Sequence, residues 1–572
     1  MHRSRLSPAR AAVLPGSPTV IRAVLQIVFV VVFVVVFPIV FLAACSQPTR
    51  PDGSNGFAEL KILAINDFHG NLEARRGDLG GASYLATHLR RAEAAAAHTV
   101  IVSAGDLIGA TPLISGLFHD EPTIEIANLW GLDFNAVGNH EFDEGSDELL
   151  RMQHGGAHPV DGESPSGPFA GAAFQFLAAN VIDDDSGDTL LPPYAIEYYA
   201  GIPVAFIGLT LEGTPSVATG TAVAGLSFMD EADTINTLVG EIQEQGVEAI
   251  VVIVHEGGVP RDGSEDDCND FSGSIVDIVE RTDPAVDLFV TGHTHRHYLC
   301  RLNGRPVTST GTAGRFYTDI NTRLDRESGD MTVVSFDNVP VTQDVEPAPD
   351  VEALVTKYRA FVETVSSSIV GTITGDFTKR QNESGESSLG GLIADAQLAA
   401  TVSPEPGAAV LAFMNSGGIR NDLLFEASGD EKNGEITFAE IFSVHPFGNN
   451  LVTMTLTGAR IHSLLEQQWS NRSSQMILMP SEGFSYAWSR TAPVGARVDP
   501  ASIHIGGVVV DPSAGYRVTV NNFLAGGGDG FTVLLEGTER VDGSVDVDAL
   551  KNYLASRSPL SPVELDRIRV LP

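Results

Sequence analysis

Residues 60–72 read LKILAINDFHGNL, an apolar run followed at once by an acid and an imidazole. The run is predicted to form a buried strand, and Asp67 and His69 stand where that strand should end. In an open α/β sheet, ligands bind beyond the carboxyl ends of the strands. One such pair also occurs by chance in a solvated turn, so its meaning depends on the other strand ends of the chain.

Four further predicted strands end in side chains of the same kinds. TVIVSAGD (99–106) ends at Asp106, FNAVGNHEFD (134–143) carries Asn139 and His140, EAIVVIVH (248–255) ends at His255, and VDLFVTGHTH (286–295) carries His293 and His295. Because parallel strands bring their carboxyl ends to one edge of a sheet, these side chains should meet.

The residue types in this set indicate metal ions. Carboxylate, imidazole and amide oxygen suit divalent cations such as Zn²⁺, Mn²⁺ or Fe²⁺. Without His140, the set contains seven ligands, which exceed the needs of one ion but with a shared carboxylate suit two ions about 3.5–4 Å apart.

The pattern of elements predicts two α/β domains. From residue 57 to about 340, β-branched apolar runs alternate with helical stretches such as 232–245 and 273–282, and residues 331–344 are predicted to close the domain as a strand pair. EPAPD (346–350) then interrupts the chain before a connecting helix over 350–368. The predicted divisions are a first domain over 57–345, a connecting segment over 346–369 and a second domain over 370–572.

In this order the strings D-x-H, G-D, G-N-H-E and G-H-x-H resemble those of the calcineurin-like metallophosphoesterases. The longer strings INDFHG (65–70), GNHEFD (138–143) and NSGGIR (415–420) narrow the resemblance to the 5′-nucleotidase family, over residues 59–570. The resemblance implies a four-layer αββα sandwich joined by a helix to a second α/β domain that binds the substrate. It also implies two divalent metal ions, drawn from Zn, Mn, Fe, Co or Mg.

The resemblance further implies a role for each strand-end residue. Asp67, His69, Asp106 and His295 would hold one ion, and Asp106, Asn139, His255 and His293 the other. His140 would be catalytic, because Asp143 three residues later can orient its ring and favour the imidazolium that protonates a leaving group. The alternative for Asp143 is a cap on the helix predicted to begin near Gly145. The histidines at 88, 98, 119, 154, 158, 297, 445, 462 and 504 are interpreted as surface or packing residues.

The second domain carries candidate substrate-binding residues. HPFGNN (445–450) and NNFLAGGGDGF (521–531) supply Phe447 and Phe523, and aromatic rings stack on nucleobases. Alone, each is an ordinary core or turn residue; the resemblance matches them to a base-stacking pair and Asp529 to an acid near the nucleoside. The remaining candidates are Asn415, Gly418 and Arg420 in NSGGIR and Arg380 in FTKRQNES (377–384). ESSLGGL (386–392) departs from the family pattern of Asn before Met-Gly, which leaves the alignment of Arg380 open.

The charge balance excludes some partners. The chain has 35 Lys and Arg against 73 Asp and Glu, a formal net charge of −38, and binding of nucleic acid polymers requires a basic surface. We therefore expect a small-molecule nucleotide substrate, no nucleic acid polymer, and a few arginines that attract the phosphate locally. No oligomeric state is assigned.

The N-terminus is predicted to be a targeting segment. Residues 1–44 contain four arginines and no acid, and an uncharged run over 23–45 ends in LAAC, which resembles a bacterial lipobox with Cys45 as the lipidated residue. The run is long enough to span a bilayer, so an uncleaved anchor helix is the alternative. Residues 1–45 are thus a signal peptide or lipoprotein anchor and 46–56 a tether, which predicts an exported, membrane-tethered protein at the cell surface or in the periplasm.

Two further cysteines, Cys268 and Cys300, follow the loops of His255 and of His293 and His295. In an exported protein such a pair is expected to form a disulfide, and two free thiols are the alternative.

The whole sequence predicts an exported two-metal phosphohydrolase that acts on nucleoside 5′-monophosphates, with nucleotide diphosphate sugars as further substrates. The open alternatives are a 2′,3′-cyclic-nucleotide phosphodiesterase with 3′-nucleotidase activity and a nucleotide-binding surface protein without turnover. GNHEFD favours the nucleotidase, since cyclic phosphodiesterase relatives tend to have Asn where Asp143 stands.

Overall fold

The computed structural model describes residues 56–74, 79–260, 268, 270–402, 408–470, 472, 474–562 and 564–571. Residues 1–55, and with them the predicted signal segment and Cys45, lie outside the described residues. Among the helices of the described part, none has the length and apolar character needed to cross a bilayer.

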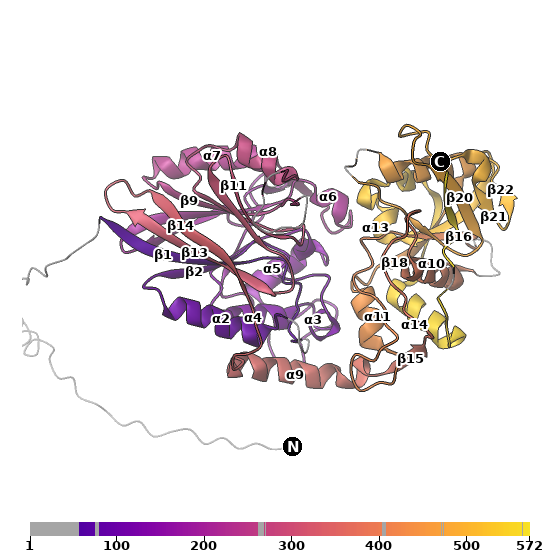
Figure 1. Cartoon of the computed structure of the whole chain (residues 1–572), viewed down its shortest axis with the longest axis horizontal. Helices are drawn as coiled ribbons and strands as arrows, with labels where there is room; N and C mark the ends of the chain where they lie inside the picture. Colours follow the sequence, from indigo (N-terminus) through magenta and orange to yellow (C-terminus); the bar gives the residue numbers. More distant parts are fainter. Residues whose placement is uncertain are drawn as a thin grey trace, which may run out of the picture. The chain divides into compact units, whose positions relative to one another are not determined.

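Two six-stranded sheets form the centre of the first domain (Figure 1). The first sheet has the order β14 (Met331–Pro340), β13 (Phe316–Asp325), β1 (Phe57–Ile65), β2 (Thr99–Ser103), β3 (Phe134–Ala136) and β4 (Gln175–Leu177). The second has the order β11 (His297–Leu302), β12 (Arg305–Thr310), β10 (Leu288–Thr291), β9 (Ala249–His255), β7 (Ile202–Thr210) and β6 (Tyr194–Tyr199). Strands β1 to β4 are parallel, as are β7, β9, β10 and β12, whereas β13, β14, β11 and β6 are antiparallel edge additions.

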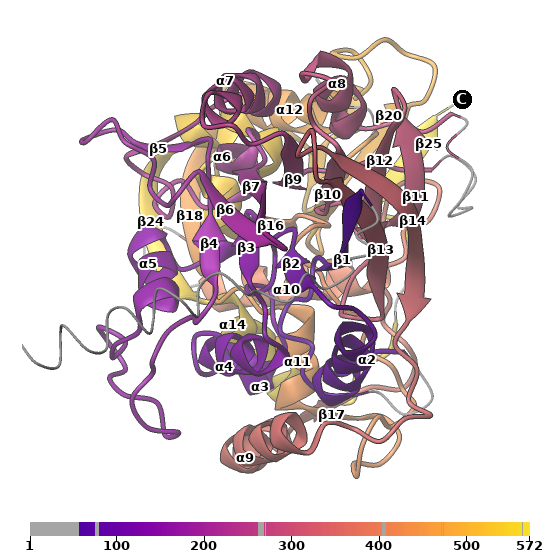
Figure 2. The same cartoon turned by 90° about the vertical axis from the view of Figure 1, so that its left-hand side faces the viewer.

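Alternation along each strand explains why the sheets stack. On β1, Leu60, Ile62 and Ala64 lie in a core shared with the second sheet, whereas Leu63 and Ile65 face the helices on the other side. Strands buried on both faces need apolar residues almost throughout, and residues 60–65 (LKILAI) are apolar except for Lys61, which pairs with Asp319. Figures 1 and 2 show the helices on the two outer faces of the paired sheets. They are α2 (Ala82–Ala94), α4 (Glu121–Trp130) and α9 (Pro349–Ser366) on one face and α7 (Glu231–Glu244) and α8 (Ser274–Arg281) on the other.

The four-layer αββα sandwich is therefore confirmed, and the helices predicted at 232–245 and 273–282 form as α7 and α8. The strand pair predicted within residues 331–344 is wrong. Residues 331–340 form the single strand β14, and its antiparallel partner is β13. The turn lies upstream, where the Asp325 side chain accepts hydrogen bonds from the backbone N–H groups of Glu327 and Ser328.

The connecting helix α9 belongs to the first domain's core. Its residues Val351, Val355, Tyr358 and Val362 recur at helical spacing and join the cluster that includes Leu85 and Ile124 of α2 and α4. The helix thus fixes the point from which the second domain begins.

The second domain contains a five-stranded sheet with helices α10 and α14 beside it (Figure 1). The sheet has the order β19 (Met479–Pro480), β16 (Leu411–Met414), β23 (Gly515–Asn521), β18 (Asn450–Thr457) and β24 (Thr538–Val545). Two smaller sheets contain β22 (Val508–Val509), β21 (His504–Ile505), β20 (Phe484–Ser489) and β25 (Ile568–Leu571), and β15 (Ile369–Thr372) and β17 (Glu435–Thr437). The helices are α10 (Ser388–Thr401), α11 (Phe438–Val444), α12 (Gly458–Glu466), α13 (Asn522–Ala525) and α14 (Asp546–Arg557). Asn415, Gly418 and Arg420 follow β16, and Phe447 follows α11. Phe523 lies in the short helix α13, directly after β23, and Arg380 lies in the loop between β15 and α10.

Candidate active site

The strand-end side chains of the first domain converge into two groups that share one carboxylate. Asp67, His69, Asp106 and His295 place one ligand atom each within 4.8 Å of one another, and Asp106, His255 and His293 do the same. Asn139 is next to the second group, because its side-chain oxygen lies 3.0 Å from Nδ1 of His293. The sequence-predicted ligands are thus all brought together, from the ends of strands in both sheets.

Strained backbone holds this arrangement. Asp67, His69 and Asp106 have φ values of 48°, 47° and 49°, in the left-handed region that residues with a Cβ seldom adopt. His293 and His295 have φ values of 69° and 54°. Such conformations persist where surrounding structure enforces them, and they concentrate at functional sites. Backbone N–H groups of Asp67 and His69 donate to the carbonyls of Gly105 and Asp106, which ties the ends of β1 and β2 together.

Gly105 is required by close approach. It has a φ of 84°, and a Cβ there would lie 2.6 Å from Nδ1 of His255. The ring of His255 therefore packs directly against the backbone that carries Asp106.

Two histidine rings are oriented by backbone carbonyls. Nδ1 of His69 lies 2.8 Å from the carbonyl of Gly109, and Nδ1 of His255 lies 2.7 Å from that of Ala104. With the N–H at Nδ1 donated outward, each Nε2 presents its lone pair to the centre. Nε2 of His69 is 3.1 Å from Nε2 of His295, and Nε2 of His255 is 3.1 Å from Oδ2 of Asp106. Two lone pairs at such distances repel each other unless a proton or a metal cation lies between them, and this donor set of imidazoles and carboxylates fits divalent metals.

The pKa shifts of the buried residues at this centre also fit a bound cation. Burial opposes the ionisation of Asp106, but the imidazoles of His255 and His140 hold its pKa well below the usual range. Burial likewise opposes protonation of His255, yet Asp106 raises the pKa of that ring to about 10. Burial and His255 together lower the pKa of His293 to about 4. The centre therefore favours a negative Asp106 compensated by nearby positive charge.

His140 and Asp143 form the predicted pair. Nδ1 of His140 lies 2.9 Å from Oδ2 of Asp143; His140 begins the 3₁₀ turn η1 (His140–Phe142), and Asp143 directly follows it. The capping alternative for Asp143 finds no support in α5 (Ser146–His154), whose N-cap is Gly145. Burial lowers and Asp143 raises the pKa of His140, with a net rise.

Glu141 also belongs to this site, although it is not among the residues predicted from the sequence. Its buried carboxylate accepts from the backbone N–H groups of Asp106, Leu107 and Gly138 at 2.7–3.0 Å. It thereby fixes the loops after β2 and β3 against each other. Its position between His140 and Asp143 in GNHEFD was the available signal.

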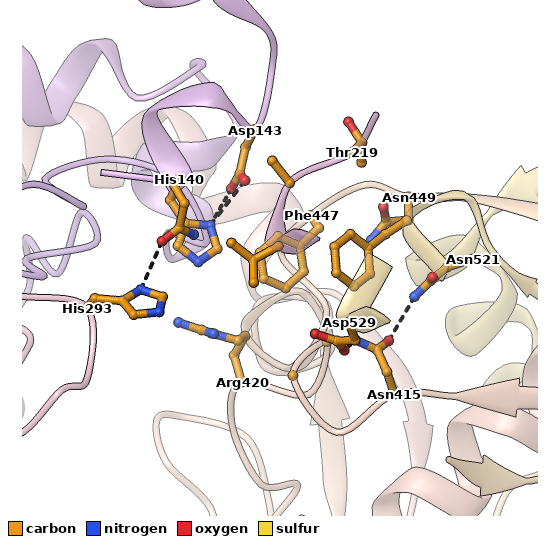
Figure 3. A pocket seen from close by; sticks show the side chains of 16 residues that line it. His140, Asp143, Thr219, His293, Asn415, Arg420, Phe447, Asn449, Asn521 and Asp529 are labelled. Carbon is orange, nitrogen blue, oxygen red and sulfur yellow. Dashed lines mark hydrogen bonds and ion pairs between the residues drawn. The ribbon is translucent and has the colours of Figure 1, made fainter. Parts of the chain in front are cut away.

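A cavity of about 190 Å³ extends from this centre to the second domain's loops (Figure 3). Its lining contains ten predicted site residues: Asn139, His140, Asp143, His293, Asn415, Gly418, Arg420, Phe447, Phe523 and Asp529. Gly417, Asn449, Asn521 and the segment 217–219, which begins at the last residue of α6 (Thr214–Val217), also line it and were not predicted. The candidate catalytic residues and the candidate substrate-binding residues therefore line the same cavity.

Hydrogen bonds fix the polar end of this cavity. Asn415 donates to Oδ2 of Asp529 at 2.8 Å, and Asn521 donates to Oδ1 of Asn415 at 3.1 Å (Figure 3). Burial raises the pKa of Asp529, against the opposing effect of the bond from Asn415.

Phe447 and Arg420 are the second-domain residues of this cavity that approach the first-domain residues His140 and His293 (Figure 3). The Phe447 ring stacks on His140 with centroids 5.6 Å apart and an interplanar angle of 18°, and the Arg420 guanidinium lies 5.7 Å from its centroid. Arg420 points toward His293 in Figure 3. It also lines a second cavity of about 430 Å³ together with His69, His295 and Lys379. Arg380 is exposed and lines neither cavity, whereas its neighbour Lys379 lines the second.

Cys268 and Cys300 form a disulfide with a Cα–Cα distance of 5.6 Å. It joins the segment after β9, the strand that ends at His255, to β11, the strand that begins four residues after His293.

Two protein-family profiles match this chain. The profile described as calcineurin-like phosphoesterase matches residues 60–297, and that described as 5′-nucleotidase, C-terminal domain, matches residues 369–536. The chain is 31% identical to the endonuclease YhcR of Bacillus subtilis over 89% of this chain and 41% of that protein. It is 30% identical to the cell wall protein Lmo0130 of Listeria monocytogenes over 88% of this chain and 68% of that protein.

The fold is also similar to a solved structure. The 5′-nucleotidase precursor of Thermus thermophilus superposes with a TM-score of 0.71 at 25% identity, covering 90% of this chain and 99% of that one. The chain thus spans less than half of the YhcR protein but matches this structure over nearly its full length. Profile matches, relatives and fold agree with the geometry, and the chain belongs to the 5′-nucleotidase family of calcineurin-like metallophosphoesterases.

Proposed function

We propose that this protein hydrolyses nucleoside 5′-monophosphates to nucleosides and phosphate. One observation carries the proposal: His140, Asn139 and His293 line the same cavity as Phe447, Phe523 and Asp529. A substrate in this cavity would have its phosphate at the metal-ligand groups and its base among the second domain's aromatic side chains.

Calcineurin-like metallophosphoesterases use two divalent metal ions, and this chain has two ligand groups for them. We assign Asp67, His69, Asp106 and His295 to one ion and Asp106, Asn139, His255 and His293 to the other, with Asp106 shared. Ions bound there would supply an activated water nucleophile and neutralise phosphate charge.

The protein's own residues would assist the departure of the nucleoside. Asp143 accepts a hydrogen bond from Nδ1–H of His140 and so directs Nε2 toward the cavity, where a proton held on Nε2 can pass to the leaving oxygen. The guanidinium of Arg420, which belongs to both cavities, can pair with phosphate oxygens and supply local positive charge.

The second domain would recognise the nucleoside. Phe447 and Phe523 offer aromatic faces to the base, and base–aromatic stacking is worth about 1–3 kcal/mol. The Asp529 carboxylate, oriented by Asn415, can accept hydrogen bonds from ribose hydroxyls.

The second cavity supports nucleotide diphosphate sugars as further substrates. It is lined by His69 and His295 of the metal-ligand groups and by Lys379 and Arg420, so it provides room and positive charge beyond the reacting phosphate. A substrate with a group on each side of that phosphate could occupy both cavities.

Export and membrane tethering through Cys45 complete the proposal. The acid-free N-terminal segment ending in LAAC supports them, and a cell wall protein is among the relatives. Labelling cells with a lipid precursor tests the anchor: a lipid-labelled wild type and an unlabelled, larger Cys45→Ala form are expected, and an unlabelled wild type would contradict it.

A substrate panel tests the enzymatic function. The full-length protein, stripped of metal and reconstituted with Mn²⁺ or Zn²⁺, is offered a nucleoside 5′-monophosphate, a nucleotide diphosphate sugar, a 2′,3′-cyclic nucleotide, an aryl phosphate, and DNA and RNA. The monophosphate should have the highest kcat/KM. DNA and RNA are included because one relative is named an endonuclease, although the net charge of −38 disfavours polymers. Fastest hydrolysis of a polymer or a cyclic nucleotide would refute the proposal.

A further inference from the structure

Asp120 is a buried carboxylate that does not cap its own helix. It directly precedes α4, at the position where an aspartate side chain usually accepts a hydrogen bond from an N–H group of the first helical turn. Its side chain makes no such bond, and its backbone has a φ of 61°, in the left-handed region. The residue is 7% exposed. Helix capping by its side chain therefore does not explain why an aspartate occupies this position.

Two other segments of the chain donate to the Asp120 carboxylate. Oδ2 accepts the backbone N–H of Gly109 at 2.9 Å, and Oδ1 accepts the hydroxyl of Ser115 at 2.6 Å. Gly109 lies in the loop after β2, and Ser115 lies in the short helix α3 (Leu113–Gly116). Ser115 is itself buried, and its Oγ lies 2.6 Å from Oγ1 of Thr123 in α4. Asp120 thus joins the loop after β2 to α3 and α4.

Gly109 contacts two elements of the active site. Its carbonyl oxygen lies 2.8 Å from Nδ1 of the candidate ligand His69. A Cβ at Gly109 would lie 2.4 Å from the carbonyl oxygen of His140 and 2.8 Å from Oδ2 of Asp143, so the loop packs directly against this pair. Because Gly109 has a φ of 77° and no side chain, its position depends on its hydrogen bonds. The bond from Gly109 to Asp120 therefore bears on His69 and on the pair of His140 and Asp143.

The Asp120 carboxylate is costly for stability in its surroundings. Among the described residues, no Lys, Arg or His side chain forms an ion pair with it. Burial raises the pKa of Asp120 to about 6, although the hydrogen bonds from Ser115 and Gly109 lower it. The carboxylate of Glu144 raises this pKa further. Groups that are costly in this way are typical of functional sites.

We propose that Asp120 is a positioning residue of the active site. By fixing Gly109, it keeps the Gly109 carbonyl on Nδ1 of His69, so that Nε2 of that ring faces the other metal ligands. The same bond keeps the loop packed against His140 and Asp143. Asp120 is not among the residues that line the two active-site cavities, so it acts through these neighbours. Its effect on turnover rests on the proposed function, whereas its effect on metal binding rests only on the ligand groups.

Two substitutions of Asp120 separate the hydrogen bond from the charge. Asp120→Ala leaves the N–H of Gly109 without its acceptor, and loss of a group that orients a ligating histidine lowers metal affinity or activity by about 10–100-fold. Asp120→Asn keeps the shape of the side chain. Its amide oxygen can accept from Gly109, and its NH₂ group can donate to Oγ of Ser115.

Titration of the metal-stripped full-length protein with Mn²⁺ tests the proposal. Electron paramagnetic resonance distinguishes free from bound Mn²⁺ and gives the affinity of each of the two sites. The matched control is Asp287→Ala, because Oδ2 of Asp287 accepts the backbone N–H of Ile250 at 2.9 Å near the start of β9, whereas His255 ends that strand. Melting temperatures and rates on a nucleoside 5′-monophosphate and an aryl phosphate are measured for the same variants.

Asp120→Ala should weaken one Mn²⁺ site by about 10–100-fold, leave the other within about threefold, and lower kcat on both substrates. Asp120→Asn should restore the weakened site to within about threefold of the wild type. Asp287→Ala should lower the melting temperature and bind both ions as the wild type does. Wild-type Mn²⁺ affinities in Asp120→Ala, no recovery in Asp120→Asn, or an equal weakening in Asp287→Ala would overturn the proposal.

A second variant covers a failure of Asp120→Ala to fold. Ser115→Ala removes only the bond to Oδ1 and should weaken the same Mn²⁺ site to a smaller degree. An unchanged affinity in this variant would then overturn the proposal. If the affinities change as expected but the wild-type protein hydrolyses no nucleotide, the proposed function fails and the positioning role of Asp120 stands.

Discussion

The strand ends of the first domain that carry the candidate metal ligands, called here the ligand edge, and the substrate loops of the second domain are built in different ways. At the ligand edge, five candidate ligands have left-handed backbone, and buried groups such as Glu141 bind several backbone N–H groups each. In the second domain, Phe447 and Phe523 line the cavity through their shape and their ring surfaces. The candidate catalytic residues are thus held by many mutually dependent bonds, whereas recognition depends on the surfaces of a few side chains. Substitutions in the two regions should differ accordingly.

The largest effect is expected at the shared carboxylate. Asp106→Ala removes the one side chain common to both ligand groups and should abolish turnover of every substrate. Metal analysis and steady-state kinetics check this together. Two catalytic ions bound with near-normal turnover in the variant would show that Asp106 is not the bridge.

His140→Ala should have the next largest effect. Losing a general acid lowers kcat by roughly 10²–10⁴-fold. The loss should be smaller for an aryl phosphate, whose leaving group needs little protonation. Rates on both substrates are compared, and an identical loss on each would remove the proton-donor role while leaving a purely electrostatic one.

The disulfide belongs to the ligand edge and should act on stability. It spans a sequence separation of 32 residues, for which the chain-entropy treatment gives about 3.7 kcal/mol of unfolding free energy. Denaturant unfolding of a Cys268→Ser/Cys300→Ser variant measures this. A pair of free thiols in wild-type protein purified without a reductant would contradict the pairing.

Substitutions in the substrate loops should be selective. Phe523→Ala should chiefly raise KM for nucleotides, by about 1–3 kcal/mol in binding free energy, and leave an aryl phosphate nearly unaffected. Phe447→Ala should affect both substrates, because the Phe447 ring stacks on His140. Equal behaviour of the two phenylalanine variants would mean that this contact has no functional consequence.

The sequence predicted the ligand edge well because metal binding restricts residue types and strand ends restrict positions. Asp67, Asp106 and His255 could be selected on those two grounds alone. Glu141 was missed because it acts on backbone N–H groups of distant loops, and such contacts have no local sequence pattern.

Other features depend on tertiary packing. The strand β13 was not predicted as the partner of β14, because the polar turn between them, after Asp325, was not taken into account. Lys379 rather than Arg380 lines the second cavity, a difference of one position that loop geometry decides. His119 and His158 were assigned to the surface, since residues so far apart in sequence show no sign of their stacking.

The division of work between the domains is the central claim, and a double-mutant cycle tests it most directly. kcat/KM is measured for the wild type, His140→Ala, Phe523→Ala and the double variant, on a nucleoside 5′-monophosphate and on an aryl phosphate. Residues that act separately should give additive effects within about 0.3–0.5 kcal/mol. The account predicts additivity on the nucleotide and no effect of Phe523→Ala on the aryl phosphate. Equal damage by Phe523→Ala to both substrates would contradict it and leave Phe523 as a packing residue beneath the glycine-rich loop.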